Sequence, residues 1–222
     1  QNFSDVKGVV SGYLTLQGTT ENPVFNGKLI AQKSAFTIDY LQTRYNFTHI
    51  INVSDNRMIF DNTVVYDKYG NKSNIDGNIH FKKLKSLSYD FKVNANEFLT
   101  LNTSGADNST YYGDGFASGL VNIQGNMEEK NLVIDASVST EENTIINLPI
   151  GSSGETQTTQ FITFKGADTI KKEEFRELAT DLSGIDLNFD LEVTPLAETR
   201  LIFDPALGDM IKARGRGNLN MK

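Results

Sequence analysis

The sequence predicts an all-β protein, and three features of the chain carry this prediction. Alternating apolar and polar residues recur along most of its length, which is the period of a β-strand with one apolar face. Short segments rich in Gly, Asn, Asp and Ser separate the alternating runs and are typical of tight turns. Hydrophobic residues make up only 38 % of the 222 residues, which suits a sheet with one solvated face. Strands joined by short turns predict an antiparallel meander in a single domain, residues 1–222.

A glycine followed by apolar residues two and four positions later recurs along the chain. The irregular spacing of the copies excludes a fixed-period solenoid repeat. Each copy predicts a strand that is entered through a bend or bulge permitted by the glycine. The copies begin at Gly12, Gly27, Gly77, Gly119 and Gly217.

Other alternating runs fill the intervals between these copies. We predict a strand at each run and a tight turn at each separator. The runs cover residues 47–53, 57–66, 89–95, 132–138 and 145–150, and the separators cover residues 21–27, 67–71, 104–108 and 151–154.

The C-terminal part holds the clearest strand signal, residues 185–193, which alternate without a break. Pro195 ends this run, because proline cannot donate a hydrogen bond to a neighbouring strand. Residues 199–203 and 218–221 are two further predicted strands, with a polar turn around residues 214–217 between them. Each of these strands would have one apolar and one polar face.

One segment departs from the strand pattern. Asp168 is a suitable helix cap, apolar residues follow at helical spacing, and Gly184 is a suitable stop. We therefore predict a short amphipathic helix over about residues 169–182, within an insertion spanning about 168–183. It would serve either as a surface connector at the sheet edge or as a gate over an apolar groove.

Charge and composition exclude several classes of function. A net charge of −7 argues against binding to nucleic acid or to anionic lipid headgroups. The absence of cysteine excludes disulfides and thiolate metal sites. No run approaches the roughly 18 apolar residues of a membrane-spanning helix. The abrupt ends of the sequence lead us to expect a piece of a longer protein.

The sequence contains no recognisable catalytic or metal-binding constellation. Neither His49 nor His80 lies in a cluster with ligand spacing, and both are expected to be solvated strand residues. A calcium ion at Asp107, Asn108 and Asp114 is conceivable, but a polar turn explains these residues as well. The carboxylates of residues 186, 190 and 192 fit a solvated strand face better than acid–base catalysis. We predict no enzyme activity, no cofactor and no metal.

The apolar faces leave two arrangements open. Two sheets packed about 10 Å apart would bury these faces in a sandwich core. A long sheet folded lengthwise without closing would instead leave an apolar trough, which would hold acyl chains. Periodicity alone does not separate the two.

Several motifs together resemble the C-terminal TamB domain of the translocation and assembly module, in the form carried by Bacteroidetes. The resemblance covers nearly the whole chain, except the predicted helix. The strongest match joins Val193-Thr-Pro195 to Phe203-Asp-Pro-Ala-Leu-Gly-Asp209 and Gly215-Arg-Gly-Asn-Leu219. Other matching stretches are Gly12-Tyr-Leu-Thr-Leu-Gln-Gly18, Asn22-Pro23 with Gly27, Asp67 to Asn71 leading into Gly77-Asn-Ile-His-Phe81, Leu101-Asn-Thr103, Tyr111 to Gly119, Thr140 to Pro149 and Phe161-Ile-Thr-Phe164.

This resemblance implies a fold and a function. The fold is a long curled antiparallel sheet, the β-taco, with an apolar interior groove. The full-length protein would be anchored in the inner membrane of a Gram-negative bacterium and cross the periplasm to an Omp85-type outer-membrane barrel such as TamA. The groove would carry phospholipid acyl chains between the membranes, or assist the assembly and secretion of outer-membrane proteins by binding their nascent β-strands. No catalytic residues are carried over from the family.

The predicted groove-lining residues combine the alternation with this resemblance. The alternation places them on one apolar face, and the resemblance implies that this face is a groove. They are Leu14, Leu16, Ile79, Phe81, Val121, Ile123, Leu187, Phe189, Leu191, Leu201, Phe203, Leu219 and Met221. The alternative function is a secreted or surface β-sandwich that binds carbohydrate or acts as an adhesin, for which Tyr111 and Tyr112 are the candidate aromatic platform. An envelope hydrolase or lyase is disfavoured, because the sequence contains no catalytic constellation.

Overall fold

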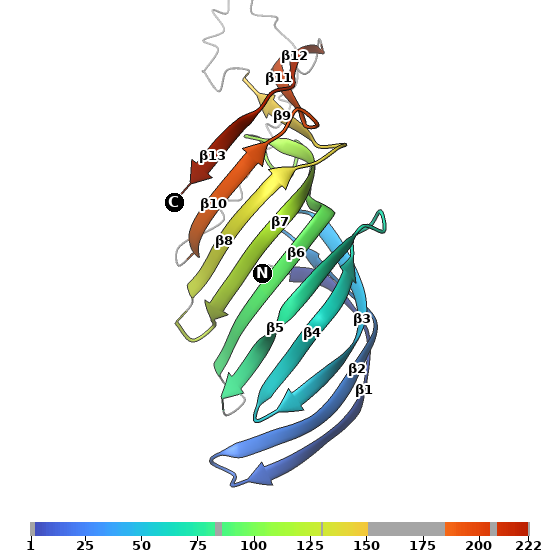
Figure 1. The fold of residues 1–222 in the computed structure, drawn as a ribbon, viewed down its shortest axis with the longest axis vertical. Coiled ribbons are helices and arrows are strands. Elements are labelled where there is room, and N and C mark those ends of the chain that lie inside the picture. The colour runs from blue at the N-terminus through green and yellow to red at the C-terminus, as the bar shows by residue number, and fades with distance from the viewer. Residues whose placement is uncertain (1–2, 83–85, 130, 151–184, 205–207, 222) are drawn as a thin grey trace, which may run out of the picture.

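The computed structural model of the chain describes residues 3–82, 86–129, 131–150, 185–204 and 208–221. In these ranges the regular structure consists of thirteen strands in one sheet, as Figure 1 shows, and no helix. The predicted helix at about 169–182 lies outside the described residues. The strands are β1 (Phe3–Gly18), β2 (Pro23–Ile38), β3 (Thr43–Ser54), β4 (Arg57–Tyr66), β5 (Lys72–Lys82), β6 (Ser86–Thr103), β7 (Tyr112–Asn126), β8 (Asn131–Thr140), β9 (Ile145–Pro149), β10 (Ile185–Val193), β11 (Glu198–Asp204), β12 (Asp209–Ala213) and β13 (Gly217–Met221).

Strands β1 to β8 form the predicted antiparallel meander, in which each strand pairs with its neighbour in sequence. The sheet then divides at β7. One end of β7 pairs with β8, which is followed by β10 and β13, and the other end pairs with β9, which is followed by β11 and β12. Two of these pairs, β8 with β10 and β9 with β11, are parallel, so the sheet is mostly rather than wholly antiparallel.

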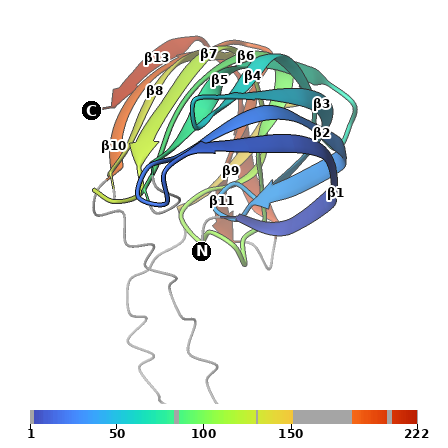
Figure 2. The same ribbon diagram turned by 90° about the horizontal axis from the view of Figure 1, so that it is seen from below.

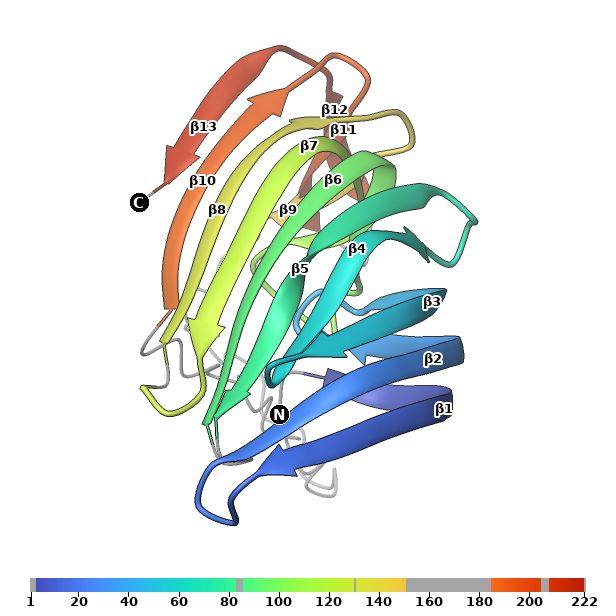
Figure 3. The same ribbon diagram turned by 60° about the horizontal axis from the view of Figure 1, so that its bottom comes forward.

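The long sheet that the family resemblance implied is present, but it is neither closed nor strongly curled. Individual strands bend along their length, and Figures 2 and 3 show that the bent strands give the sheet an arched form. Both β1 and β13 have a single neighbour and lie at the sheet edges, and β1 is exposed along its whole length. The described residues form one sheet rather than two sheets packed as a sandwich.

Most of the predicted strands are confirmed, as are the turns at 67–71 and 104–108. The predicted separator at 21–27 is wrong over most of its length, because the chain pairs with β1 from Pro23 onward as β2, and the separator at 151–154 lies outside the described residues. The run at residues 185–193 is β10, and the runs at 57–66, 132–138 and 145–150 lie within or overlap β4, β8 and β9.

Of the five motif glycines, only Gly217 begins its strand, and the other four lie inside strands, so the prediction that each strand is entered through its glycine is wrong for them. Those four lie where the neighbouring strand approaches closely, whereas an added Cβ at Gly217 would meet nothing within 4 Å. At Gly119, which has φ +143°, an added Cβ would lie 2.3 Å from the Ser137 carbonyl oxygen, so only glycine fits there.

A small core forms where β3 and β6 approach each other. Tyr45 and Phe98 stack with ring centroids 4.9 Å apart, and the smaller Val65 and Ala95 complete the cluster. The Tyr45 hydroxyl donates to the Leu99 carbonyl oxygen at 2.9 Å. Burial raises the pKa of Tyr45 to about 12.

Asp67, in the turn between β4 and β5, anchors this turn to β6. Its carboxylate accepts hydrogen bonds from the backbone N–H groups of Tyr69, Asn71 and Leu99 and from the Asn71 side-chain amide. Asp67 is only 2 % exposed, yet its charge is well compensated by these donors. The turn that precedes β5 is therefore hydrogen-bonded to β6 at Leu99, beyond the residues of β6 that pair with β5.

Candidate functional site

The strand register places most of the predicted groove residues on one face of the sheet. Side chains of directly opposed residues in adjacent strands point to the same side. Val121 is opposite Ala136, which is opposite Phe189, and Phe189 is in turn opposite Met221. The same relation links Ile123 to Leu187 through Ile134. Leu191 and Leu219 are opposite each other in the next positions of β10 and β13.

The same face continues through the N-terminal half of the sheet. Ile123 is opposite Phe91, and Ile79 is opposite Tyr89 on the same side of β6. Ile79 is opposite Met58, and Met58 is opposite Val53. Val53 is opposite Gly27, which is opposite Leu14 in β1. We call this surface the apolar face. Of the predicted residues it includes Leu14, Leu16, Ile79, Phe81, Val121, Ile123, Leu187, Phe189, Leu191 and Leu219.

Two predicted residues lie apart from these. Leu201 and Phe203 belong to β11, which joins the sheet through β9. Leu201 is half-buried and Phe203 is 46 % exposed, whereas Ile202 between them is buried at 6 %. The buried position of β11 is therefore the one that the alternation had not selected.

Exposure along the apolar face changes from its middle to its ends. Phe81 is 6 % exposed, and the predicted residues of β5, β7 and the centre of β10 are buried or half-buried. Leu16 in β1 is 65 % exposed, and Leu14, Leu187 and Leu219 are also exposed. Apolar side chains thus meet solvent near both edges of the sheet, where no other described strand covers them.

Aromatic side chains that were not among the predicted residues extend this face. Phe25 packs against Phe81 with ring centroids 5.8 Å apart, and Phe60 packs against Phe91 at 5.5 Å. His49 stacks on Phe60 at 6.4 Å, so it lies on the apolar face and not on the solvated one. The alternating runs at 47–53, 57–66 and 89–95 contained the signal for most of these residues. His49 was missed because its polarity outweighed its position.

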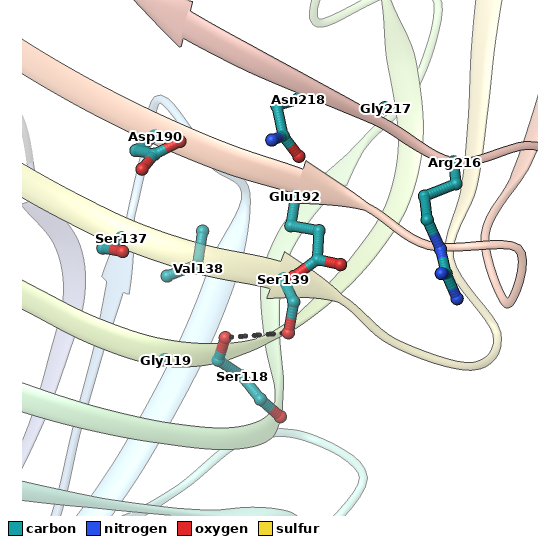
Figure 4. Close-up of a pocket in the computed structure, with 10 residues that line it drawn as sticks. All are labelled: Ser118, Gly119, Ser137, Val138, Ser139, Asp190, Glu192, Arg216, Gly217 and Asn218. Atoms are coloured by element: carbon teal, nitrogen blue, oxygen red, sulfur yellow. Dashed lines mark hydrogen bonds between the residues drawn. The ribbon is translucent and has the colours of Figure 1, made fainter.

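The opposite face of the sheet carries many polar side chains across β7, β8, β10 and β13, together with exposed apolar residues such as Leu120 and Ile50. A depression of about 700 Å³ is lined by residues from β7, β8, β10 and β13 and from the turn before β13. Figure 4 labels these residues. Ser118, Ser139, Glu192 and Asn218 follow one another across these four strands. Asp190 lies beside this row, which fits the predicted solvated carboxylate face. This row consists of hydroxyl, carboxylate and amide groups.

The residues considered for calcium are used by their own loop. The Asp107 carboxylate accepts hydrogen bonds from the Ser104 hydroxyl and backbone N–H, which lower the pKa of Asp107. Asn108 Oδ1 accepts from the N–H groups of Thr110 and Tyr111. This arrangement is that of a polar turn. Within the described ranges, no group of three or more His, Cys, Asp or Glu residues is arranged to hold a metal ion.

A model of the TamB C-terminal domain family matches residues 62–222, which is well over half of the chain. The chain belongs to the TamB C-terminal domain family. Membership implies a TamB-like protein of the bacterial envelope, in a family that is generally non-catalytic and that implies a TamA-like partner. No curated protein and no solved structure matches the chain.

The TamB match begins inside β4, but the sheet does not. Strands β1 to β3 continue the same antiparallel order and the same apolar face beyond the matched residues. Among the described residues of this TamB domain, no helix is long and apolar enough to cross a membrane.

Proposed function

We propose that this TamB domain is a non-enzymatic conduit segment that shields phospholipid acyl chains on its apolar face. The proposal rests on one observation: apolar side chains are continuous across the sheet from β1 to β13. In its proposed role we call the apolar face the apolar trough. Exposed apolar area costs about 25 cal/mol per Å², so contact with acyl chains would stabilise the trough.

The wider setting follows from the family. The full-length protein would be of the type carried by Bacteroidetes, anchored in the inner membrane and extending through the periplasm. Its partner would be an Omp85-type outer-membrane barrel similar to TamA. The trough would then connect the two membranes, with the acyl chains inside and the polar face of the sheet in water.

A second candidate function is assistance to outer-membrane protein assembly and secretion. The observation that favours it is the edge strand β1, which is exposed over all its residues and, among the described strands, pairs only with β2. An incoming β-strand could pair with this edge through backbone hydrogen bonds. The two functions are compatible, because one uses the face of the sheet and the other uses its edge.

The single sheet does not favour the alternative of a secreted β-sandwich. A sandwich needs a second sheet over the apolar face, and the described strands belong to one sheet. The candidate aromatic platform is also occupied in part, since the Tyr111 hydroxyl is hydrogen-bonded to the Tyr40 hydroxyl at 2.9 Å.

Native mass spectrometry of the domain purified from bacterial membranes, combined with lipid extraction, tests the conduit. The wild-type domain is expected to retain phospholipid. Phe189→Glu and Leu14→Glu place a charge in the trough and are expected to lose it, because a buried unpaired carboxylate and an acyl chain exclude each other. Leu14 is 45 % exposed, so its substitution should leave folding intact.

The matched control is Leu120→Glu. Leu120 is 59 % exposed and precedes Val121 in β7, so it points to the opposite face of the sheet. This variant should retain phospholipid at the wild-type level. A lipid-free wild-type domain, or equal loss of lipid in all three variants, would refute the conduit.

A further inference from the structure

Three β-bulges in the sheet share one construction. The bulged residues have φ angles of 48° to 49°, in the left-handed region that residues other than glycine rarely adopt. Each of them donates its backbone N–H to a side-chain oxygen on the following strand, rather than to a carbonyl. The pairs are Lys33 to Thr48 Oγ1 at 3.0 Å, Asn62 to Asp76 Oδ1 at 2.7 Å, and Glu97 to Ser118 Oγ at 2.9 Å.

These bulges lie on every second strand, β2, β4 and β6, and the acceptors lie on β3, β5 and β7. At each one the register between neighbouring strands shifts, so the bulged N–H has no carbonyl opposite it. The three bulged residues are exposed, so their N–H groups take either water or a nearby side-chain oxygen as the acceptor. The facing Thr, Asp or Ser side chain supplies it and thereby holds the bulge in its left-handed conformation.

The three bulges and their acceptors form a line across the sheet. This line continues to the turns that separate β8 from β9 and β10 from β11. Ser118 is opposite Ser139, next to the turn at residues 141–144 that separates β8 from β9. There the Thr194 N–H donates to Thr140 Oγ1 at 2.8 Å, beside the turn that separates β10 from β11. Again a side-chain oxygen takes the place of a carbonyl.

The line is not at constant register across the whole sheet. The β6 residue opposite Asp76 is Lys92, whereas the bulge in β6 is at Glu97. Figure 1 shows that the strands run obliquely to the long axis of the molecule. A line along that axis therefore crosses successive strands at shifted positions. The difference in register between the β5 acceptor and the β6 bulge follows from this oblique direction of the strands.

We infer that this line of bulges is a crease, meaning a line along which the sheet bends. It fixes the angle between the two parts of the sheet that lie on either side of it, which we call the two halves. A bulge bends its strand and increases the local twist, and bulges on alternate strands bend the sheet across its width. The side-chain acceptors are the positioning residues of this crease. If the conduit proposed above is correct, the crease also sets the width of the apolar trough.

Spin-label distances test the crease without any lipid. The chain has no cysteine, so Gln124→Cys in β7 and Lys212→Cys in β12 introduce two unique labelling sites on opposite sides of the line. Both residues are exposed. The distance between the labels, measured by pulsed EPR, reports the angle between the two halves.

Two substitutions at one position give opposite expectations. Glu97→Gly keeps the left-handed conformation without steric strain and should leave the distance unchanged. Glu97→Val cannot adopt that conformation readily, and Ser118→Ala removes the acceptor. Both should shift the mean distance by about 5 Å, roughly one spacing between strands, or split the distribution.

Unchanged distances in folded Glu97→Val and Ser118→Ala variants would overturn the crease, as would an equal shift in Glu97→Gly. If Glu97→Val fails to fold, the comparison of Ser118→Ala with Glu97→Gly carries the same test. The link to function is separate. A shifted distance with wild-type lipid retention would leave the crease in place and refute its control of the trough.

Discussion

Replacement of Asp67 by alanine should be among the most destabilising single changes in this domain. Its carboxylate accepts hydrogen bonds at 2.8 Å from Tyr69 N–H and at 3.0 Å from Leu99 N–H and from both the backbone and side-chain nitrogens of Asn71. Hydrogen bonds to a charged group contribute about 1.5–3 kcal/mol each in the folded state. The donors of the exposed turn regain water in the variant, but Leu99 is fully buried and its N–H does not.

The expected loss is therefore about 3–5 kcal/mol in the free energy of unfolding, which is a large share of the stability of an ordinary domain. Asp67→Asn should lose about 1–3 kcal/mol, because the amide nitrogen cannot accept a hydrogen bond from a backbone N–H. Urea denaturation followed by far-UV circular dichroism measures both values, since the chain contains no tryptophan.

Lys68→Ala is the control for this measurement. Lys68 is exposed and adjacent to Asp67, and its ammonium group donates to Asn102 at 2.6 Å. Its replacement should change the free energy of unfolding by less than about 0.5 kcal/mol. Equal effects of Asp67→Ala and Lys68→Ala would refute the anchoring role of Asp67.

Three further predictions concern the small core and the close strand contacts. Burial raises the pKa of Tyr45 from its ordinary value of about 10 to about 12. The domain should therefore lose about 3 kcal/mol of stability as the pH rises from 10 to 12, and Tyr45→Phe should remove most of that loss in alkaline denaturation curves. Phe98→Ala removes the ring that stacks on Tyr45 and should cost about 3–5 kcal/mol, seen as a lower urea midpoint at unchanged slope. Gly119→Ala brings a methyl group against the Ser137 carbonyl oxygen and should cost more than about 2 kcal/mol, whereas Gly70→Ala, where an added Cβ meets nothing within 4 Å, should cost less in the same assay despite its positive φ.

The local pattern of the chain was sufficient to locate most strands. Residues 185–193 alternate in the sequence and form β10 with the same bounds, and the predicted separator at 67–71 is the turn between β4 and β5. Side chains two residues apart in a strand always share a face, so the sequence also predicted which residues lie together on each strand. The apolar face of β5, β7 and β10 follows from this rule alone.

Other features required the partner strands to be known. Asp67 looked like an ordinary turn residue, because its buried partner Leu99 lies more than thirty positions away. His49 looked solvated until Phe60 was placed beside it. At the bulge, the Glu97 N–H donates to Ser118 Oγ. The residues around Glu97 contain no sequence signal that predicts its left-handed backbone.

The sequence by itself determined most of the strands and turns and the two-faced character of the strands, because these depend on neighbours along the chain. It did not predict β12 or the start of β2 at Pro23. Only the tertiary structure decided that β8 and β10 run parallel, that the described strands form one open sheet, and that the apolar faces join into one surface. Those outcomes depend on hydrogen bonds between segments distant in sequence, and a period of two residues carries no information about which strand lies alongside.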